Sequence, residues 1–193
     1  TYVVYLANGN EVSGFQFVAN ADEPSLRGVG WGFGDLPPTI NGASIHDNAF
    51  SGFSHAISVY GPYGTVVVKN NHVTSQINQK GRHIMIWPSN EAPSQLDLSI
   101  LSNTVRYTGA FENTRGIQCY TQGFCRVNAN ISNNVVEMTN AGLAHPAILI
   151  QASSTDSYYQ LHNNIVSTNA STAFQITGIS GTTATFDISG NRV

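Results

Sequence analysis

Charged side chains are scarce in this chain of 193 residues. Lys and Arg together number 8 and Asp and Glu number 11, which is 10% of the residues, against roughly 25% in an ordinary soluble domain. No basic cluster is present, so we expect no nucleic-acid partner. No apolar run approaches the roughly 18 residues that a membrane span needs. Ala, Leu, Glu and Lys are too few for a helix bundle or a coiled coil.

Cysteine occurs only twice, as Cys119 and Cys125 in the segment CYTQGFC. One pair without a nearby His supplies too few ligands for a structural metal site, so we expect no metal there. A close pair that flanks a Gly-containing turn could close a small loop in an oxidising compartment, and we predict this disulfide. Two independent free thiols are the alternative.

Asparagine and glycine, with 20 and 18 residues, are abundant where an ordinary domain would have more charged residues. Part of the Asn excess recurs in one pattern: an apolar residue, two variable residues, Asn, one variable residue and an apolar residue. Successive Asn positions are 38, 23, 32, 31, 30 and 27 residues apart, and such repeats indicate a solenoid. The positions, of which the first is a weaker copy, are Asn10, Asn48, Asn71, Asn103, Asn134, Asn164 and Asn191.

Alternation with period two, which is typical of strands, extends each copy on both sides. A second alternating run follows each of the five Asn positions from 48 to 164 and carries Ile57, Ile84, Ile117, Ile148 or Phe174. The chain is therefore predicted to be a single all-β domain over 1–193, a parallel β-helix of about seven coils stacked about 4.8 Å apart. We expect the Asn column to be structural: Asn tolerates positive φ at a sharp corner, and stacked amides can form a hydrogen-bonded ladder.

The main alternative fold is the leucine-rich repeat, whose L-x-L-x-x-N-x-L pattern fits residues 98–105. Leu occurs only nine times, and the Ile and Val at most apolar positions favour strands. The seven repeats together resemble the right-handed parallel β-helices of the pectate lyase-like superfamily, which includes polysaccharide lyases, some glycoside hydrolases and phage tailspikes. This resemblance implies a fold and does not specify an activity.

Two columns of the second strands are candidates for function. Tyr60, Trp87 and Tyr120 fall on the outward position of consecutive coils and are predicted to form a flat strip that binds sugar rings. Packing beneath loops is the alternative for these rings. His55, Arg82 and Arg115 fall near the start of the same strands, with His83 beside Arg82.

This second column suits an acidic polysaccharide. In a lyase, Arg82 and Arg115 would neutralise a uronate carboxylate while His83 or a Tyr removes the α-proton, so Arg82, His83 and Arg115 are the candidate catalytic residues. Alternatively, both arginines pair with Glu112, Asp156 or a backbone carbonyl. A hydrolase would need two carboxylates on neighbouring positions, and Asp47, Asp97 and Asp187 are not so placed.

The carboxylate cluster by which pectate lyases bind Ca²⁺ is not apparent either, so no cofactor is expected, with calcium left open. We therefore expect an extracellular, secreted protein that binds, and in the lyase hypothesis cleaves, an acidic polysaccharide. The alternative is a structural or adhesive module of a surface fibre, tailspike or filament, with end-to-end or lateral self-association. Both ends lack an obvious cap, which suggests a piece of a longer chain.

Overall fold

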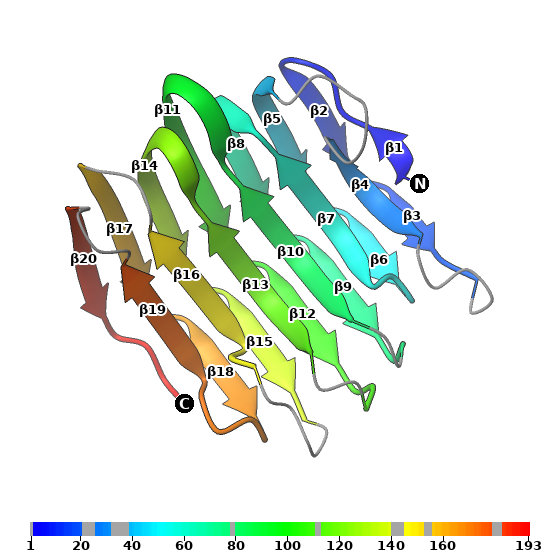
Figure 1. Cartoon of the computed structure of the whole chain (residues 1–193). Coiled ribbons are helices and arrows are strands. Elements are labelled where there is room, and N and C mark those ends of the chain that lie inside the picture. The colour runs from blue at the N-terminus through cyan, green and yellow to red at the C-terminus, as the bar shows by residue number, and fades with distance from the viewer. Residues whose placement is uncertain are drawn as a thin grey trace.

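A computed structural model describes residues 2–20, 26–31, 39–77, 80–110, 113–139, 145–152, 156–178 and 183–193, with only the backbone described for 89–93 and 122–124. In this part of the chain every regular element is a strand, and none of it is a helix that could cross a membrane. All strand pairs are parallel, and they form three sheets of seven, seven and six strands. The predicted parallel β-helix is confirmed (Figure 1).

We name the sheets A, B and C in the order in which the chain visits them. Sheet A contains β1 (Tyr2–Tyr5), β4 (Arg27–Trp31), β7 (His55–Tyr60), β10 (Gly81–Trp87), β13 (Thr114–Tyr120), β16 (Ile148–Ala152) and β19 (Phe174–Gly178). Sheet B contains β2 (Asn10–Ser13), β5 (Ile40–His46), β8 (Pro62–Lys69), β11 (Ser89–Leu101), β14 (Gln122–Ser132), β17 (Ser157–His162) and β20 (Ala184–Ser189). Sheet C contains β3 (Gln16–Val18), β6 (Ala49–Ser51), β9 (His72–Ser75), β12 (Thr104–Tyr107), β15 (Val135–Met138) and β18 (Ile165–Thr168).

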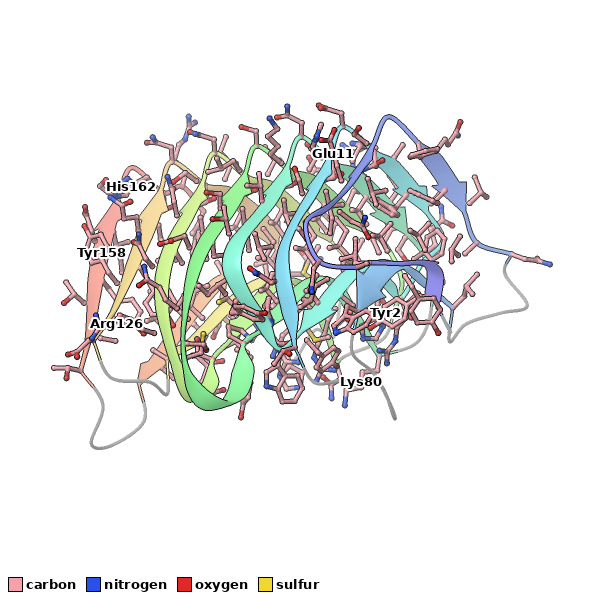
Figure 2. All side chains as sticks on the ribbon, turned by 90° about the horizontal axis from the view of Figure 1, so that it is seen from above. Tyr2, Glu11, Lys80, Arg126, Tyr158 and His162 are labelled. Atoms are coloured by element: carbon pink, nitrogen blue, oxygen red, sulfur yellow. The ribbon has the colours of Figure 1, made fainter. Side chains whose placement is uncertain are left out.

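One strand from each sheet makes a coil. The described residues form six complete coils and part of a seventh, in which β19 and β20 are followed by a bridge between Ile165 and Arg192. The core lies between the sheets, where side chains fill the interior (Figure 2). It is built from columns of like residues. Ile57, Ile84, Ile117 and Ile148 are successive register partners and are all buried. Burying such a side chain stabilises the fold by roughly 1.5–3 kcal/mol.

The first repeat was assigned wrongly from the sequence. In the β2–β5 pairing Asn10 lies opposite Ala43 and Val12 opposite Ile45, so Asn10 is not in the Asn column. The β3–β6 pairing places Gln16 opposite Ala49, which puts Phe15 next to Asn48, and the Phe15 backbone N–H donates to the Asn48 Oδ1 at 3.1 Å. Strand pairing, which a short pattern does not reveal, sets this register.

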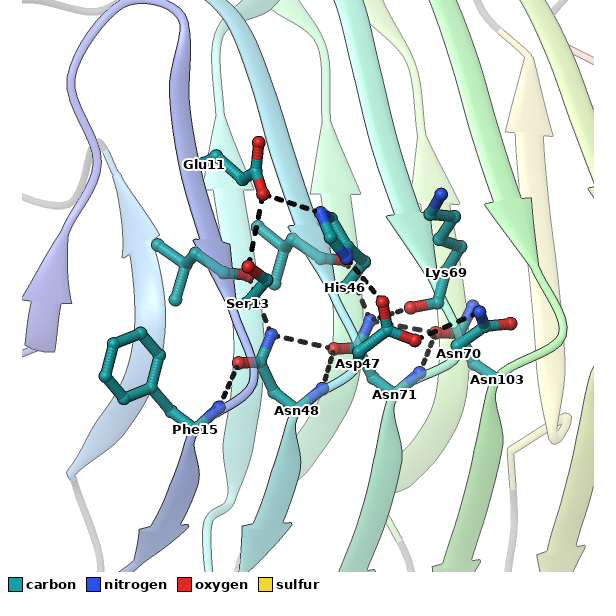
Figure 3. Close-up of polar contacts among 12 residues, drawn as sticks. Glu11, Ser13, Phe15, His46, Asp47, Asn48, Lys69, Asn70, Asn71 and Asn103 are labelled. Carbon is teal, nitrogen blue, oxygen red and sulfur yellow. Dashed lines mark hydrogen bonds and ion pairs between the residues drawn. The ribbon is translucent and has the colours of Figure 1, made fainter.

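From Asn48 to Asn191 the asparagines are joined by side-chain hydrogen bonds. Asn103 shows the pattern: its Oδ1 accepts from the backbone N–H and the Nδ2 of Asn71, both at 3.0 Å. Its Nδ2 donates to the Val68 carbonyl at 2.9 Å and to the Asn134 Oδ1 at 3.0 Å. Both donors and both acceptor positions of a fully buried amide are therefore satisfied. Figure 3 shows this arrangement at Asn48 and Asn71.

The sharp corner does not require positive φ at the column asparagine itself. The left-handed residue is the one before it, with φ between 54° and 59° at Asp47, Asn70, Ser102, Asn133 and Asn163. Gly190 takes this place before Asn191, with a φ of 66°. At each of these corners, therefore, one residue turns the chain, and the next residue joins neighbouring coils by hydrogen bonds.

We expect Asn103→Ala to lower the free energy of unfolding by about 3 kcal/mol, because it leaves the Asn71 N–H and the Val68 carbonyl buried without partners. The measurement is urea unfolding followed by circular dichroism. Asn128→Ala is the control, since Asn128 is exposed on β14 and bonds only the partly exposed Asp97 among the described side chains; we expect a change below about 0.5 kcal/mol. Equal losses in the two variants would contradict a structural role for the column.

The predicted disulfide is absent: Cys119 and Cys125 are free thiols, and both are buried. β13 ends at Tyr120 and β14 begins at Gln122, so the chain between the two cysteines turns the corner from sheet A to sheet B and forms no separate loop. Burial raises the pKa of the Cys119 thiol to about 12, and the thiolate that reacts with alkylating agents is therefore not populated near neutral pH.

We expect iodoacetamide, applied without a reductant, to modify neither cysteine in native buffer and both in denaturant. Mass spectrometry of the intact protein gives the number of modified thiols. Two cysteines that stay unmodified in denaturant, and become reactive only after reduction, would contradict the free thiols.

Candidate functional site

The outer face of sheet A carries a row of basic side chains. Arg27 is the register partner of His55, and Arg82 is the register partner of Arg115. The β7–β10 register places His55 next to Arg82, so the four residues lie on four consecutive coils. We call Arg27, His55, Arg82 and Arg115 the basic row; each is partly exposed. The sequence predicted three of its members and missed Arg27.

Arg27 was missed because the glycines around it resemble a loop. The structure instead forms β4 from this segment, and the glycines allow close packing: a Cβ on Gly28 would collide with the Ala56 carbonyl, and one on Gly30 with the Ser58 carbonyl and the Tyr2 ring. Arg27 donates to the Tyr2 hydroxyl at 3.1 Å, and its guanidinium lies 5.3 Å from the centroid of that ring.

An aromatic row runs beside the basic row. Tyr60, Trp87 and Tyr120, the aromatic row, end β7, β10 and β13, and all three are partly exposed. The Tyr60 and Trp87 centroids are 5.1 Å apart with an interplanar angle of 33°, and the Trp87 and Tyr120 centroids are 4.8 Å apart at 70°. The rings are in contact as predicted from their column, but they are tilted against one another and do not form a flat strip.

Between the two rows the outward positions are buried. Ser58, Met85, Gln118 and Leu149 alternate with core residues such as Ile57 and are outside the hydrophobic core cluster. The Tyr60 hydroxyl donates to the Met85 sulfur at 3.8 Å, so the aromatic row leans over this strip. The Ser58 Oγ and the Gln118 Oε1 have no hydrogen-bond partner among the described residues.

His83 is not part of the surface cluster that the sequence predicted. Its side chain is fully buried and faces the core, where its ring centroid lies 5.3 Å from that of Tyr107 on β12. Burial lowers the pKa of His83 to about 4, so the ring is neutral at pH 7. The alternation breaks here, because His83 and Ile84 both point inward. The small residues at the equivalent positions, Ala56, Gly116 and Ala147, are the sequence signal of this inward column.

His145, which is not a member of either predicted column, also lies at the site. Arg115 Nη2 is 3.0 Å from the His145 Nδ1 and Nη1 is 3.5 Å from the Asn113 Oδ1, so both groups accept from the guanidinium. Burial lowers the pKa of His145, and the charges of Arg115, Arg82 and Lys80 act in the same direction. Burial and then Arg27 lower the pKa of His55 to about 3. The positive charge of the face therefore comes from the arginines and Lys80.

No carboxylate among the described side chains lies on sheet A. Glu11, Asp47, Asp97, Asp156 and Asp187 belong to sheet B or its corners, and Glu137 to sheet C. Asp156 pairs with Arg126 at 3.2 Å, so the suggested pairing with Arg82 or Arg115 is wrong for that residue. Glu112, the other suggested partner, lies outside the described residues. Sheet A therefore carries described cations without described carboxylates, whereas sheets B and C carry both.

A second polar cluster lies at the opposite side of the coils, on sheet B. His46 Nδ1 is 2.6 Å from Asp47 Oδ2, and His46 Nε2 is 3.1 Å from Glu11 Oε1 (Figure 3). In the described part of the chain, no group of three or more His, Cys, Asp or Glu residues is arranged to hold a metal ion. The candidate site is therefore the pair of rows on sheet A.

Comparisons of this chain with protein-family models, with curated proteins and with solved structures found no match. The geometry of sheet A is therefore the basis for a functional proposal.

The buried His83 predicts a specific dependence of stability on pH. Its pKa is lowered from 6.5 to about 4 in the folded state, so its contribution is complete above pH 6.5 and is lost as the pH falls toward 4, where the unfolded chain binds the proton first. This contribution is at most about 3 kcal/mol. We expect His83→Leu to reduce the loss of stability between pH 7 and about pH 5, as measured by urea unfolding.

His72→Leu is the matched control, because His72 is exposed on β9. We expect it to leave the pH dependence of the wild type unchanged. An identical pH dependence in the wild type and in His83→Leu would contradict a neutral, buried His83.

Proposed function

We propose that the outer face of sheet A binds an acidic polysaccharide outside the cell. The observation that carries this proposal is the side-by-side course of the basic row and the aromatic row over consecutive coils, on a sheet without a described carboxylate. The coils of β7, β10 and β13 each contribute one member to each row, and the coils are about 4.8 Å apart. A polymer lying along the solenoid axis would therefore meet a regular series of contacts.

The two rows suit the two sides of such a polymer. Sugar rings present apolar C–H faces, which pack on the partly exposed rings of Tyr60, Trp87 and Tyr120. The acidic substituents would accept hydrogen bonds from Arg82 and Arg115, whose planar guanidinium groups suit oxyanions. The sequence resemblance to the pectate lyase-like superfamily is consistent with this proposal, since that group contains proteins that act on polysaccharides.

We do not extend the proposal to cleavage. A lyase needs a base that reaches the substrate, and His83, the residue suggested for this role, is buried in the core. Burial raises the pKa of Tyr60 to about 12, which keeps its hydroxyl protonated. The Nδ1 of His145 already accepts from Arg115. The described side chains thus favour binding over proton abstraction.

Self-association in a fibre or filament stays a prediction of the sequence. Apolar side chains are exposed on the first coil and on the last two coils that the structure describes, including Phe15, Val18, Ile165 and Ile188. Open edges of this kind can pair with further strands. Nothing in the described residues shows what covers them, so the sheet A face is the better supported site.

We expect Trp87→Ala to weaken binding to pectate about tenfold, because it removes the central ring of the aromatic row. Affinity electrophoresis in gels containing pectate measures the change. Tyr158→Ala is the matched control, since Tyr158 is an exposed aromatic residue on β17 of sheet B; its mobility shift should equal that of the wild type.

Binding should also weaken as salt is added, because the basic row is partly exposed and its field is screened. An unaltered affinity in Trp87→Ala, or the same loss in Tyr158→Ala, would contradict binding through the aromatic row.

A further inference from the structure

Arg82 and Arg115 differ from other arginines of this chain in their register partners. Arg106 on β12 lies opposite Glu137 on β15, and its Nε is 2.6 Å from the Glu137 Oε2. Arg126 pairs with Asp156 on the next coil. The partner of Arg82, by contrast, is Arg115, so two cations lie side by side about one strand spacing apart. Like charges in this position repel each other unless an anion lies between or above them.

The two guanidinium groups also have unused donors. The Nε of Arg82 and the Nε of Arg115 are both buried, and neither has a hydrogen-bond partner among the described residues. The partners of the Arg115 Nη atoms, Asn113 and His145, are neutral, because the lowered pKa of His145 keeps its ring uncharged at pH 7. Both arginines are partly exposed and their described side-chain partners carry no negative charge, so the pair suits an anionic ligand that the chain itself does not supply.

We propose that Arg82 and Arg115 together form a subsite for a sulfate ester carried by the bound polymer. This inference rests on the proposed function and names the acidic group that the site takes. A carboxylate has two oxygens, which one guanidinium fork can occupy by itself. A sulfate ester has three terminal oxygens. Two guanidinium forks on adjacent coils can therefore each bind two of these oxygens, with one oxygen common to both forks.

The residue type agrees with a sulfate ester at this place. Both members of the subsite are arginines, whose weakly hydrated guanidinium groups match a weakly hydrated sulfate ester better than an ammonium group would.

The test compares two polymers that share a neutral backbone and differ only in the anion: dextran sulfate and carboxymethyl dextran, matched in size and degree of substitution. Isothermal titration calorimetry at one ionic strength gives both affinities. We expect dextran sulfate to bind the wild type about tenfold more tightly. Arg82→Gln and Arg115→Gln should each abolish this preference, and Arg82→Lys, which keeps the charge and loses the fork, should abolish it while binding persists.

Arg126→Gln is the matched control, because it removes one positive charge from sheet B and leaves sheet A unchanged. It should retain the preference for dextran sulfate. Circular dichroism during thermal unfolding verifies that each variant is folded, and Arg82→Lys gives a second reading if a Gln variant is not.

The results separate the subsite from the proposed function. Equal affinities for the two polymers, or binding of pectate without binding of dextran sulfate, would overturn the sulfate subsite and leave polysaccharide binding in place. The same loss of preference in Arg126→Gln would also overturn it, since the effect would then follow net charge alone. If neither dextran derivative nor pectate binds the wild type, the proposed function is overturned together with the subsite.

Discussion

Every coil of this protein depends on hydrogen bonds to its neighbours in strict register. A parallel strand cannot satisfy its own backbone groups, so each one must align with the strand before and after it. The amide of Asn103 fixes the corner of its coil to Asn71 on one side and to Asn134 on the other. Because the amide is fully buried, a shift in register would leave its polar atoms without partners. The apolar columns, the two surface rows and the position of each functional side chain all follow from this alignment.

The same alignment stacks chemically similar residues of successive coils on one another. On the inside this is favourable, since Ile57, Ile84 and Ile117 stack in one apolar column. On the outside it is unfavourable for charge, which accounts for the small number of charged residues on a solenoid wall. Where charges do stack, as in Arg106 with Glu137, they alternate in sign. The adjacent Arg82 and Arg115 depart from this rule, and for that reason they mark the candidate site.

Sequence patterns were sufficient for the fold because the signal repeats in every coil. The alternation around Ile84 and Ile117 gave the outward direction of Trp87 and Tyr120 correctly. The signal fails where the alternation is interrupted. Ile84 faces the core, so alternation predicts that His83 faces outward, yet His83 also faces the core. It also fails where several alignments fit a short motif, which is why Asn10 was taken for the position that Phe15 holds. The contact of Arg115 with His145 joins residues 30 positions apart and depends on side-chain conformations that no motif encodes.

The Asn column has a direction as well as a register. Every amide in it is oriented the same way: Nδ2 donates to the Oδ1 of the next coil and to a backbone carbonyl of the previous one, as at Asn71 and at Asn134. The side of a coil that faces the previous coil is therefore complementary to the side that faces the next one. Each pair of neighbouring asparagines in the column is joined by the same hydrogen bonds. A coil could be duplicated or excised by recombination, and the flanking amides would rejoin without a new mutation. A gene built from such units can lengthen or shorten its product one coil at a time, so the length of the outer face of sheet A can change without a change in the residues of each coil.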